Sequence, residues 1–472
     1  MAGWIKTGQF TSPASGTTVI DITDKGNDAK GIHLWCTNNT SLDTQQIHSV
    51  MNHGFSDGTN DRSILHNTDQ AAITGLNTRR SNSTTLVLSL ENPPDDVVLL
   101  TITAAAMNAN DVTLTYGTFT AGHIINFTIF GGSDCSVEVG DTPSNDASSP
   151  LTGIAFAPEF GLYMTHGAAA NDQSQFSFQS FGVSDGTNEW CLFAFQGANS
   201  PDNKGSVLIE NEVTGQMDLQ FADWGATILA MTSDGFTYEN VPTADTGGTD
   251  IFFFLLVSYA GTRDVDIGTF TKVTGAAPVT QQMPDLGFTP QAYFLASAND
   301  VGTDATAANN CRVSFGAYDG DDGQSCIETA ESGAADAANS HSRTHASEVL
   351  QISQLLNTVG IQASATPDAI TDSTPSFEWN PNTSAATIIG YYALAGAAAS
   401  EQEGFRFRND DGSESAASWR QAQDVDDTIA KNVNFRLRTL INSSGDLASA
   451  AYRLDYKETG DPDAEYRQVP LT

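Results

Sequence analysis

Basic side chains are scarce in this 472-residue chain: 20 Lys and Arg stand against 57 Asp and Glu, for a formal net charge of −37. A surface this negative repels the phosphate backbone of DNA or RNA, and anionic lipid as well, over most of its area. We therefore expect no nucleic-acid partner and no membrane partner. The same charge favours solubility at high local copy number, because like-charged surfaces resist unwanted association.

Long apolar runs and paired cysteines are also lacking. No stretch offers about 18 uninterrupted apolar residues, and Met1–Thr7 has neither the basic start nor the apolar segment of a secretory signal. We expect a chain that neither spans a membrane nor carries a signal peptide. The cysteines form no C-x-x-C pair, which predicts buried free thiols and neither a zinc site nor a disulfide framework. They are Cys36, Cys135, Cys191, Cys311 and Cys326.

Several signatures of common enzyme classes are missing. The chain contains no H-E-x-x-H helix, no P-loop and no G-x-G-x-x-G fingerprint. A glycosidase would need two carboxylates about 5–10 Å apart, and no pair among the many acids is singled out by the sequence. We predict a protein that is not an enzyme, with a hydrolase as the enzymatic alternative.

Two segments carry residues that could bind a metal. Asp319-Gly320-Asp321-Asp322-Gly323 gathers three carboxylates in a turn, and Ca²⁺ could use their oxygens, although the spacing is not that of an EF-hand. His341 and His345 lie four residues apart, which would clamp a metal on a helix. The Ser, Arg and Thr residues around them favour an exposed loop instead. We predict no cofactor, with Ca²⁺ as the alternative.

The chain repeats itself three times over its first 400 residues. A Gly follows an extended run at Gly8, Gly140 and Gly268, and an Asp-Gly turn follows a strand at Asp57, Asp185 and Asp319. Each repeat then closes on an apolar strand, 124–131, 251–261 and 388–396. The spacing of about 130 residues is that of a whole domain and is too long for a solenoid repeat.

These repeats predict an all-β fold. Runs of β-formers such as 84–90 and 97–103 flank a Pro-Pro-Asp-Asp turn, and such alternation of strands and polar turns favours antiparallel sandwich packing. We predict three tandem antiparallel β-sandwich, jelly-roll-like modules, followed by a smaller C-terminal β-domain. The predicted bounds are 1–132 for module 1, 133–262 for module 2, 263–399 for module 3 and 400–472 for the C-terminal domain.

The C-terminal domain differs from the modules in its charge pattern. It holds nine of the 20 basic residues and alternates them with apolar ones. Period-2 alternation places Arg406 and Arg408 on the strand face opposite Phe405 and Phe407, and Arg436 and Arg438 likewise opposite Phe435 and Leu437. The four arginines are either a solvated face paired with carboxylates or a docking surface for an acidic neighbour, such as another copy of this chain.

The repeated motifs resemble those of a group of structural proteins of tailed bacteriophages. In that group Gly-Phe-Thr, Phe-Gly-x-x-Asp-Gly-Thr and Asp-Gly-Phe-Thr recur in tandem β-domains, and the last stands here as 234–237. The segment 403–414, EGFRFRNDDGSE, also resembles phage and prophage proteins. Modules 1 and 2 depart from the pattern, and in module 1 the G-F-x-P turn reads Gly26-Asn27-Asp28-Ala29. The resemblance implies a role on the virion surface.

We therefore expect a structural component of a phage virion, either a capsid decoration protein or a tail or fibre protein. Its partners would be other virion proteins and itself, in a homo-oligomer such as a trimer, and it would be made in the host cytoplasm. The alternative is an adhesin for a host-surface glycan or receptor, with Trp190 or Trp224 stacking on sugars. Core packing is the other role open to these two tryptophans.

Overall fold

Two compact units make up the computed structural model: residues Met1–Ala397, which include the three modules, and residues Ala398–Thr472. The structure describes residues 3–14, 16–47, 49–68, 78–82, 84–90, 98–117, 120–142, 149–165, 177–196, 204–218, 221–241, 252–260, 264–298, 310–321, 323–332, 340–353, 360–396, 399–409, 411, 418–430, 433, 435–444, 455–456 and 467–468.

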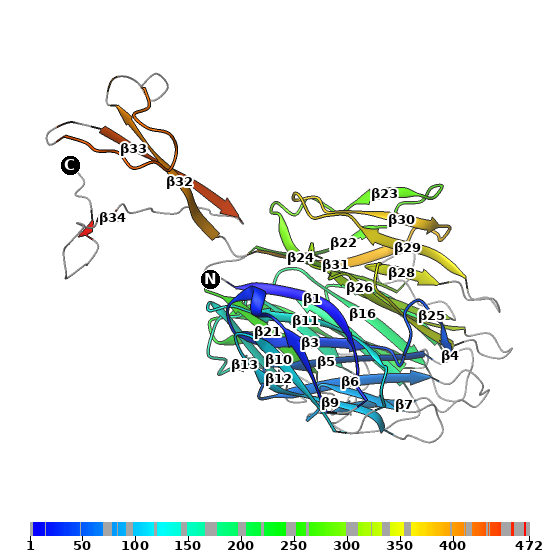
Figure 1. Cartoon of the computed structure of the whole chain (residues 1–472). Helices are drawn as coiled ribbons and strands as arrows, with labels where there is room; N and C mark the ends of the chain where they lie inside the picture. Colours follow the sequence, from blue (N-terminus) through cyan, green and yellow to red (C-terminus); the bar gives the residue numbers. More distant parts are fainter. Residues whose placement is uncertain are drawn as a thin grey trace. The chain divides into compact units, whose positions relative to one another are not determined.

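Module 1 is built from strands and one short 3-10 turn (Figure 1). These are β1 (Trp4–Thr11), β2 (Thr17–Asp21), η1 (Thr23–Lys25), β3 (Ala29–Cys36), β4 (Gln46–Ile47), β5 (Ser49–Ser56), β6 (Asp61–Thr68), β7 (Thr78–Asn82), β8 (Val87–Leu90), β9 (Val98–Met107), β10 (Asp111–Tyr116) and β11 (Ile124–Gly131).

Two antiparallel sheets pack on each other in this module. The larger has the order β1-β11-β3-β5-β6-β7, and the smaller β2-β10-β9-β8. The first strand pairs with the last, and the second with the one before the last. This wrapping is the one found in jelly rolls.

Modules 2 and 3 repeat that strand order. Module 2 contains β12 (Cys135–Asp141), β13 (Ser149–Thr152), β14 (Phe160–Thr165), β15 (Ser177–Ser184), β16 (Glu189–Gln196), β17 (Lys204–Glu210), β18 (Thr214–Asp218), β19 (Phe221–Thr232), β20 (Gly235–Val241) and β21 (Phe253–Tyr259). Module 3 contains β22 (Val265–Thr271), β23 (Val279–Gln282), β24 (Pro290–Ser297), β25 (Asn310–Tyr318), β26 (Ser325–Ser332), β27 (Ser340–His345), β28 (Leu350–Ser353), β29 (Ile361–Pro367), β30 (Ser376–Asn382) and β31 (Ile388–Ala395).

The sheets of module 2 run β12-β21-β14-β15-β16-β17 and β13-β20-β19-β18, and those of module 3 run β22-β31-β24-β25-β26-β27 and β23-β30-β29-β28. In Figure 1 the smaller sheet of module 3 forms the outer layer over β22, β31 and β24. The predicted fold class, an all-β chain of several antiparallel sandwiches, is confirmed. Among the described residues no helix is long and apolar enough to cross a membrane.

The larger sheets are buried on both faces. Every residue of β11 is buried, whereas β10 in the smaller sheet alternates buried and half-buried residues. One face of each larger sheet packs on its own smaller sheet, and the other packs on the larger sheets of the other two modules in one core. Both faces therefore need apolar residues, which explains why the closing strands are continuous apolar runs. All five cysteines are buried and free, as predicted.

Glycine lets the two sheets of each module approach closely. Gly54, Gly182 and Gly316 lie in equivalent positions, each three residues before the aspartate of the Asp-Gly turn. A Cβ atom at these positions would lie only 1.6, 2.0 and 2.2 Å from the carbonyl oxygens of Leu86, Val213 and Val349, respectively. These contacts are with backbone, which cannot move aside as a flexible side chain can, so only glycine fits.

The three modules meet around a common core. Three equivalent residues, each directly before the glycine just described, bring their rings together there: His53, Phe181 and Phe315. Their ring centroids are 4.8 Å apart for His53 and Phe181, 5.5 Å for His53 and Phe315, and 4.9 Å for Phe181 and Phe315. Since one residue from each module contributes, the modules are arranged about a pseudo-threefold axis.

Equivalent hydrogen bonds join successive modules. Val139 in β12 donates its backbone N–H to the Asp57 carboxylate of module 1 over 3.0 Å. Thr7 in β1 donates its N–H to the Asp319 carboxylate of module 3 over 2.8 Å. Thr7 and Val139 each directly precede the glycine at the equivalent position of their module's first strand. The same hydrogen bond therefore joins module 2 to module 1 and module 1 to module 3. The three modules therefore form a closed ring.

The seam between modules 2 and 3 uses other groups. Trp190 donates its indole N–H to the carbonyl oxygen of Tyr391 over 2.8 Å. The Ser206 hydroxyl bridges the backbone of Ala298 and Arg312, donating over 3.0 Å and accepting the Arg312 N–H over 2.9 Å. All three seams are thus hydrogen-bonded around the common core.

The C-terminal unit has two small antiparallel sheets of its own. Strand β32 (Ala399–Asn409) pairs with β33 (Phe435–Ser444), and β34 (Asp455–Tyr456) pairs with β35 (Arg467–Gln468). The segment 418–424 runs along the other edge of β32, because Arg420 donates its backbone N–H to Phe407 and Asp424 to Phe405.

Candidate functional site

Module 3 carries a row of buried polar and charged residues between its two sheets. The row lies on β25, β26 and β27, where the register places Ser314 opposite Glu328, and Glu328 opposite Arg343. In the strand register, each of the positions equivalent to Glu328 pairs with the residue two before the glycine described above, and they are Leu65 in module 1 and Phe193 in module 2. Module 3 therefore has a carboxylate where the other modules have an apolar core residue.

The centre of this row is a buried pair of Glu328 and His341. The His341 Nε2 and Glu328 Oε1 atoms are 3.2 Å apart, and both side chains are at most 2% exposed. Burial by itself would raise the pKa of Glu328, but the hydrogen bond and charge of His341, with help from Ser353 and Arg343, bring that pKa below its usual value. Glu328 is thus held as a carboxylate by its partners.

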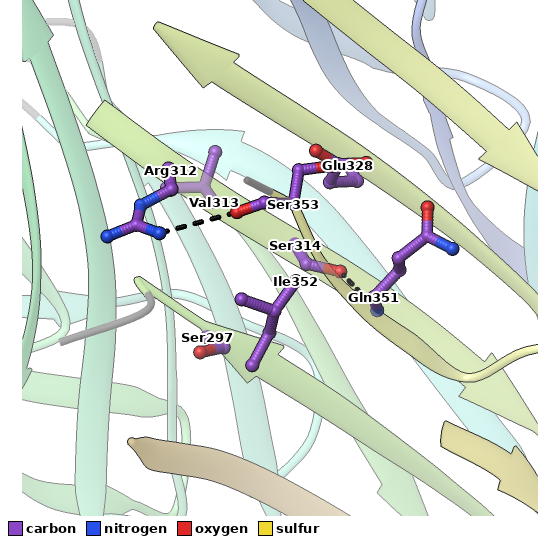
Figure 2. Close-up of a pocket in the computed structure, with 8 residues that line it drawn as sticks. All are labelled: Ser297, Arg312, Val313, Ser314, Glu328, Gln351, Ile352 and Ser353. Atoms are coloured by element: carbon purple, nitrogen blue, oxygen red, sulfur yellow. Dashed lines mark hydrogen bonds between the residues drawn. The ribbon is translucent and has the colours of Figure 1, made fainter. Parts of the chain in front are cut away.

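Figure 2 shows the small pocket beside this pair, lined by side chains from β24, β25, β26 and β28. Arg312 donates to the Ser353 carbonyl oxygen over 3.3 Å, and the Gln351 backbone N–H donates to the Ser314 hydroxyl over 3.1 Å. The enclosed space of about 10 Å³ is room for about one water molecule. The pocket is too small for an organic substrate, so its polar groups act on each other and stabilise the interior of module 3.

The row ends in a second cluster at the seam between modules 3 and 1. His345 Nδ1 lies 2.6 Å from Asp43 Oδ1 and 3.7 Å from Glu348 Oε2. The imidazole is buried, while the Asp43 side chain is exposed and that of Glu348 is partly exposed. Asp43, His345 and Glu348 each offer one ligand atom within 4.8 Å of the others. Among the described residues this group could hold a metal ion.

The prediction that His341 and His345 lie in an exposed loop is wrong. Both belong to β27, every residue of which is buried. The strand is covered because β4 of module 1 pairs with its edge as a seventh strand of the sheet. On one face, the Thr344 and Ser342 hydroxyls also bond to the side chains of Thr37 and Asn39 of module 1. Their spacing on a strand directs both histidines to the same face, but to different partners.

The Asp-Gly turns, considered for Ca²⁺, use their carboxylates for backbone hydrogen bonds. Asp57 accepts the N–H groups of Thr59 and Asn60 as well as that of Val139. Asp319 accepts those of Thr7 and Asp321. The glycines that follow have φ near +80°, the conformation that such turns require of glycine. Asp322 lies outside the described residues, and Ca²⁺ binding stays a prediction.

Two of these turns also have the G-x-S-x-G pattern of a hydrolase nucleophile elbow, at 54–58 and 182–186. An elbow places its serine between a strand and a helix, whereas Ser56 and Ser184 end strands at hairpins. Each hydroxyl accepts the N–H of the turn glycine, over 3.0 Å for Ser56 and 2.9 Å for Ser184. Both serines are buried and serve the turn.

The predicted docking arginines come together on one face of the C-terminal sheet. The register pairs Arg406 with Arg438 and Arg408 with Arg436. Trp419 covers two of them, with its ring 4.2 Å from the Arg406 guanidinium carbon and 4.7 Å from that of Arg408. Arg408 is only 3% exposed, Arg406 and Arg436 are half-buried, and Arg438 is exposed.

The two tryptophans named for sugar stacking have different outcomes. Trp190 is fully buried in the common core and bonds to module 3, so core packing is its role. The Trp224 side chain lies outside the described residues. Module 3 has an open groove of about 590 Å³. Among the described residues, its lining contains no tryptophan and includes Tyr318, Asp321, Gln324, Ser347 and Thr366.

Comparison with known proteins gives no family model and no curated protein that matches this chain.

Proposed function

We propose that the chain is a structural component of a phage virion that binds neighbouring virion subunits on the particle surface, as a capsid decoration protein or a tail or fibre protein, without catalysis. The three-module unit would be the displayed part, and the C-terminal unit would attach it. The phage assignment comes from the motif resemblance, and the division of labour from the contrast between the two units.

One observation carries that contrast. Of the nine large apolar side chains that are exposed among the described residues, five belong to the C-terminal unit. They are Trp419, Val425, Val433, Phe435 and Leu440. An apolar side chain left in water costs free energy that burial against a partner recovers. The C-terminal unit is therefore the better candidate for attachment.

Charge supports the same division. Residues 1–397 contain 43 acidic and 11 basic side chains, whereas residues 398–472 contain 14 and nine. The modules of neighbouring copies repel each other, which spaces them on a crowded particle. The arginine face meets no such repulsion from an acidic subunit surface, whether that belongs to another virion protein or to a second copy.

The ring of three modules also bears on the oligomeric state. Three modules in one chain already close a ring, so a single chain has the arrangement that three separate copies of one module would need to assemble. A homo-oligomer of whole chains, such as a trimer, stays a proposal, and so does synthesis in the host cytoplasm before assembly.

Particle binding tests the proposal. Mass spectrometry of purified particles should detect the chain, and full-length protein added to particles that lack it should bind. Arg438→Glu and Phe435→Ser should weaken this binding at least tenfold, while Val19→Ser, an equally exposed apolar site in module 1, should not. Absence of the chain from particles would remove the virion role.

A second candidate function, binding of a host-surface glycan, is favoured by the open groove in module 3. Its lining includes a carboxylate, an amide and three hydroxyls, the groups that bind sugar hydroxyls. A glycan array should show binding that Gln324→Ala removes and Arg438→Glu leaves intact. An array without any bound glycan would leave the attachment role alone.

A further inference from the structure

A segment of module 1 reaches across the ring to module 3. Strand β4 pairs with β27, with Ile47 opposite His341 and Gln46 opposite Ser342. Just before it, Asp43 donates its backbone N–H to the carbonyl oxygen of Thr344 over 2.9 Å. This bond fixes the start of the segment beside the end of β27. The seam between the first and last modules therefore holds Asp43 next to His345.

The side chains at this seam form a set of three ligand atoms. The imidazole Nδ1 of His345 faces one oxygen of Asp43 and one of Glu348, at 2.6 and 3.7 Å. Ligands of tetrahedral zinc lie about 2.0–2.2 Å from the metal, and hence roughly 3.3 Å from each other. A shift of under about 1 Å in the exposed Asp43 side chain would lengthen its distance from His345 to that value, and a similar shift in the partly exposed Glu348 side chain would shorten the other.

A second observation points to a cation at the same place. Cys326 lies directly opposite His345 in the register of β26 and β27, so both side chains project from the same face of the sheet. Its thiol is free and fully buried. The thiol therefore adds, beside the buried imidazole, a side chain of a kind that Zn²⁺ binds.

We propose that Asp43, His345 and Glu348 bind a zinc ion that joins module 1 to module 3. One imidazole nitrogen and two carboxylate oxygens are ligands that Zn²⁺ accepts, and the exposed side of Asp43 leaves a fourth position for water. Ca²⁺ takes six to eight oxygen ligands and Mg²⁺ prefers an all-oxygen octahedron, so a nitrogen ligand selects against both. The ion closes the ring at the seam between the two ends of the three-module unit.

Titration of the full chain with Zn²⁺ tests this site. Calorimetry in a large excess of Mg²⁺, which occupies the many surface carboxylates, should show one zinc ion bound per chain. Asp43→Asn and Glu348→Gln alter exposed or partly exposed groups and should leave the fold intact, yet weaken binding more than about tenfold. Asp28→Asn, at an acid exposed to a similar degree, is the matched control and should bind zinc as the unchanged chain does.

A second readout separates this site from loose binding elsewhere. Zinc should raise the unfolding temperature of the unchanged chain and of Asp28→Asn, but not that of Asp43→Asn. Co²⁺ in place of Zn²⁺ should give the visible spectrum of a four-coordinate site. Absence of a stoichiometric zinc ion under excess Mg²⁺, or equal affinity in Asp43→Asn and in the control, would overturn the proposal.

Discussion

The three-module unit and the C-terminal unit differ in the burial of their large aromatic side chains. In the former, the largest aromatic side chains are fully buried, Trp35, Trp190 and Trp379 among them. In the latter, Trp419 is 41% and Phe435 44% exposed. A closed ring offers every module two neighbours against which to bury apolar surface, whereas a two-stranded sheet has little interior of its own. We infer that the closing of the ring is what buries the large aromatic side chains of the three-module unit.

The strongest way to break this comparison is to separate the two sheets inside one module. Gly182→Val would place a Cβ 2.0 Å from the Val213 carbonyl oxygen, a backbone clash with no room to relax. We expect loss of more than about 4 kcal/mol of unfolding free energy, seen as the absence of a cooperative thermal transition. Gly275→Ala, where the nearest atom is 4.0 Å away, should melt as the unchanged chain does.

The same substitution in the two units should have unequal effects. Phe181→Ala empties a fully buried position at the axis and should cost about 3–5 kcal/mol. Phe435→Ala removes an exposed ring and should change stability by about 0.5 kcal/mol or less. Urea unfolding followed by tryptophan fluorescence measures both. Equal losses would mean that burial does not distinguish the units.

Within the three-module unit, module 3 is expected to depend on its buried charges. Glu328→Gln keeps the shape of the side chain but leaves His341 and Arg343 without their carboxylate. Removing one member of a buried ionic group costs about 3 kcal/mol. Chemical denaturation should show this loss, and Glu378→Gln, at an exposed acid of the same module, should not.

The buried His53 at the pseudo-threefold axis should also make the stability of the three-module unit depend on pH. Burial lowers the pKa of His53 from 6.5 to about 3, so the unfolded chain takes up this proton first as the pH falls. Stability is therefore lost as the pH drops below about 6.5, by about 2 kcal/mol from His53 alone at pH 5.

His53→Phe, which supplies the residue found at this position in modules 2 and 3, should remove that part of the acid sensitivity. The comparison to make is the difference in unfolding free energy between pH 7 and pH 5 for the two proteins. His33 also has a lowered pKa through burial and the charge of His53, so some sensitivity will remain. An identical pH dependence in both proteins would contradict the account.

Local chemistry explains what the sequence could predict. The Asp-Gly turns predict hairpins because glycine adopts positive φ and aspartate bonds the backbone after it. The spacing of these turns along the chain indicates the three repeats. Alternation likewise placed the four arginines on one face. The common core could not be foreseen, because His53, Phe181 and Phe315 are brought together only by packing between modules.

The two candidate sites in module 3 could not be predicted either, because packing between segments that are distant in the sequence assembles them. Asp43 and His345 are 302 residues apart in the chain, and no motif links them. The polar sequence of β27 resembles a loop, but module 1 covers the strand through β4, Thr37 and Asn39. A sign of the buried row was present, since Glu328 replaces Leu65 and Phe193, but reading it requires the strand register.

Hydrogen exchange in the full-length Phe181→Ala variant, measured peptide by peptide with mass spectrometry, tests the closed ring most directly. If the three modules share one core, peptides from β5 in module 1 and from β25 in module 3 should lose protection as much as those from β15 in module 2. Loss of protection confined to module 2 would mean that the modules fold separately, and would contradict the closed ring.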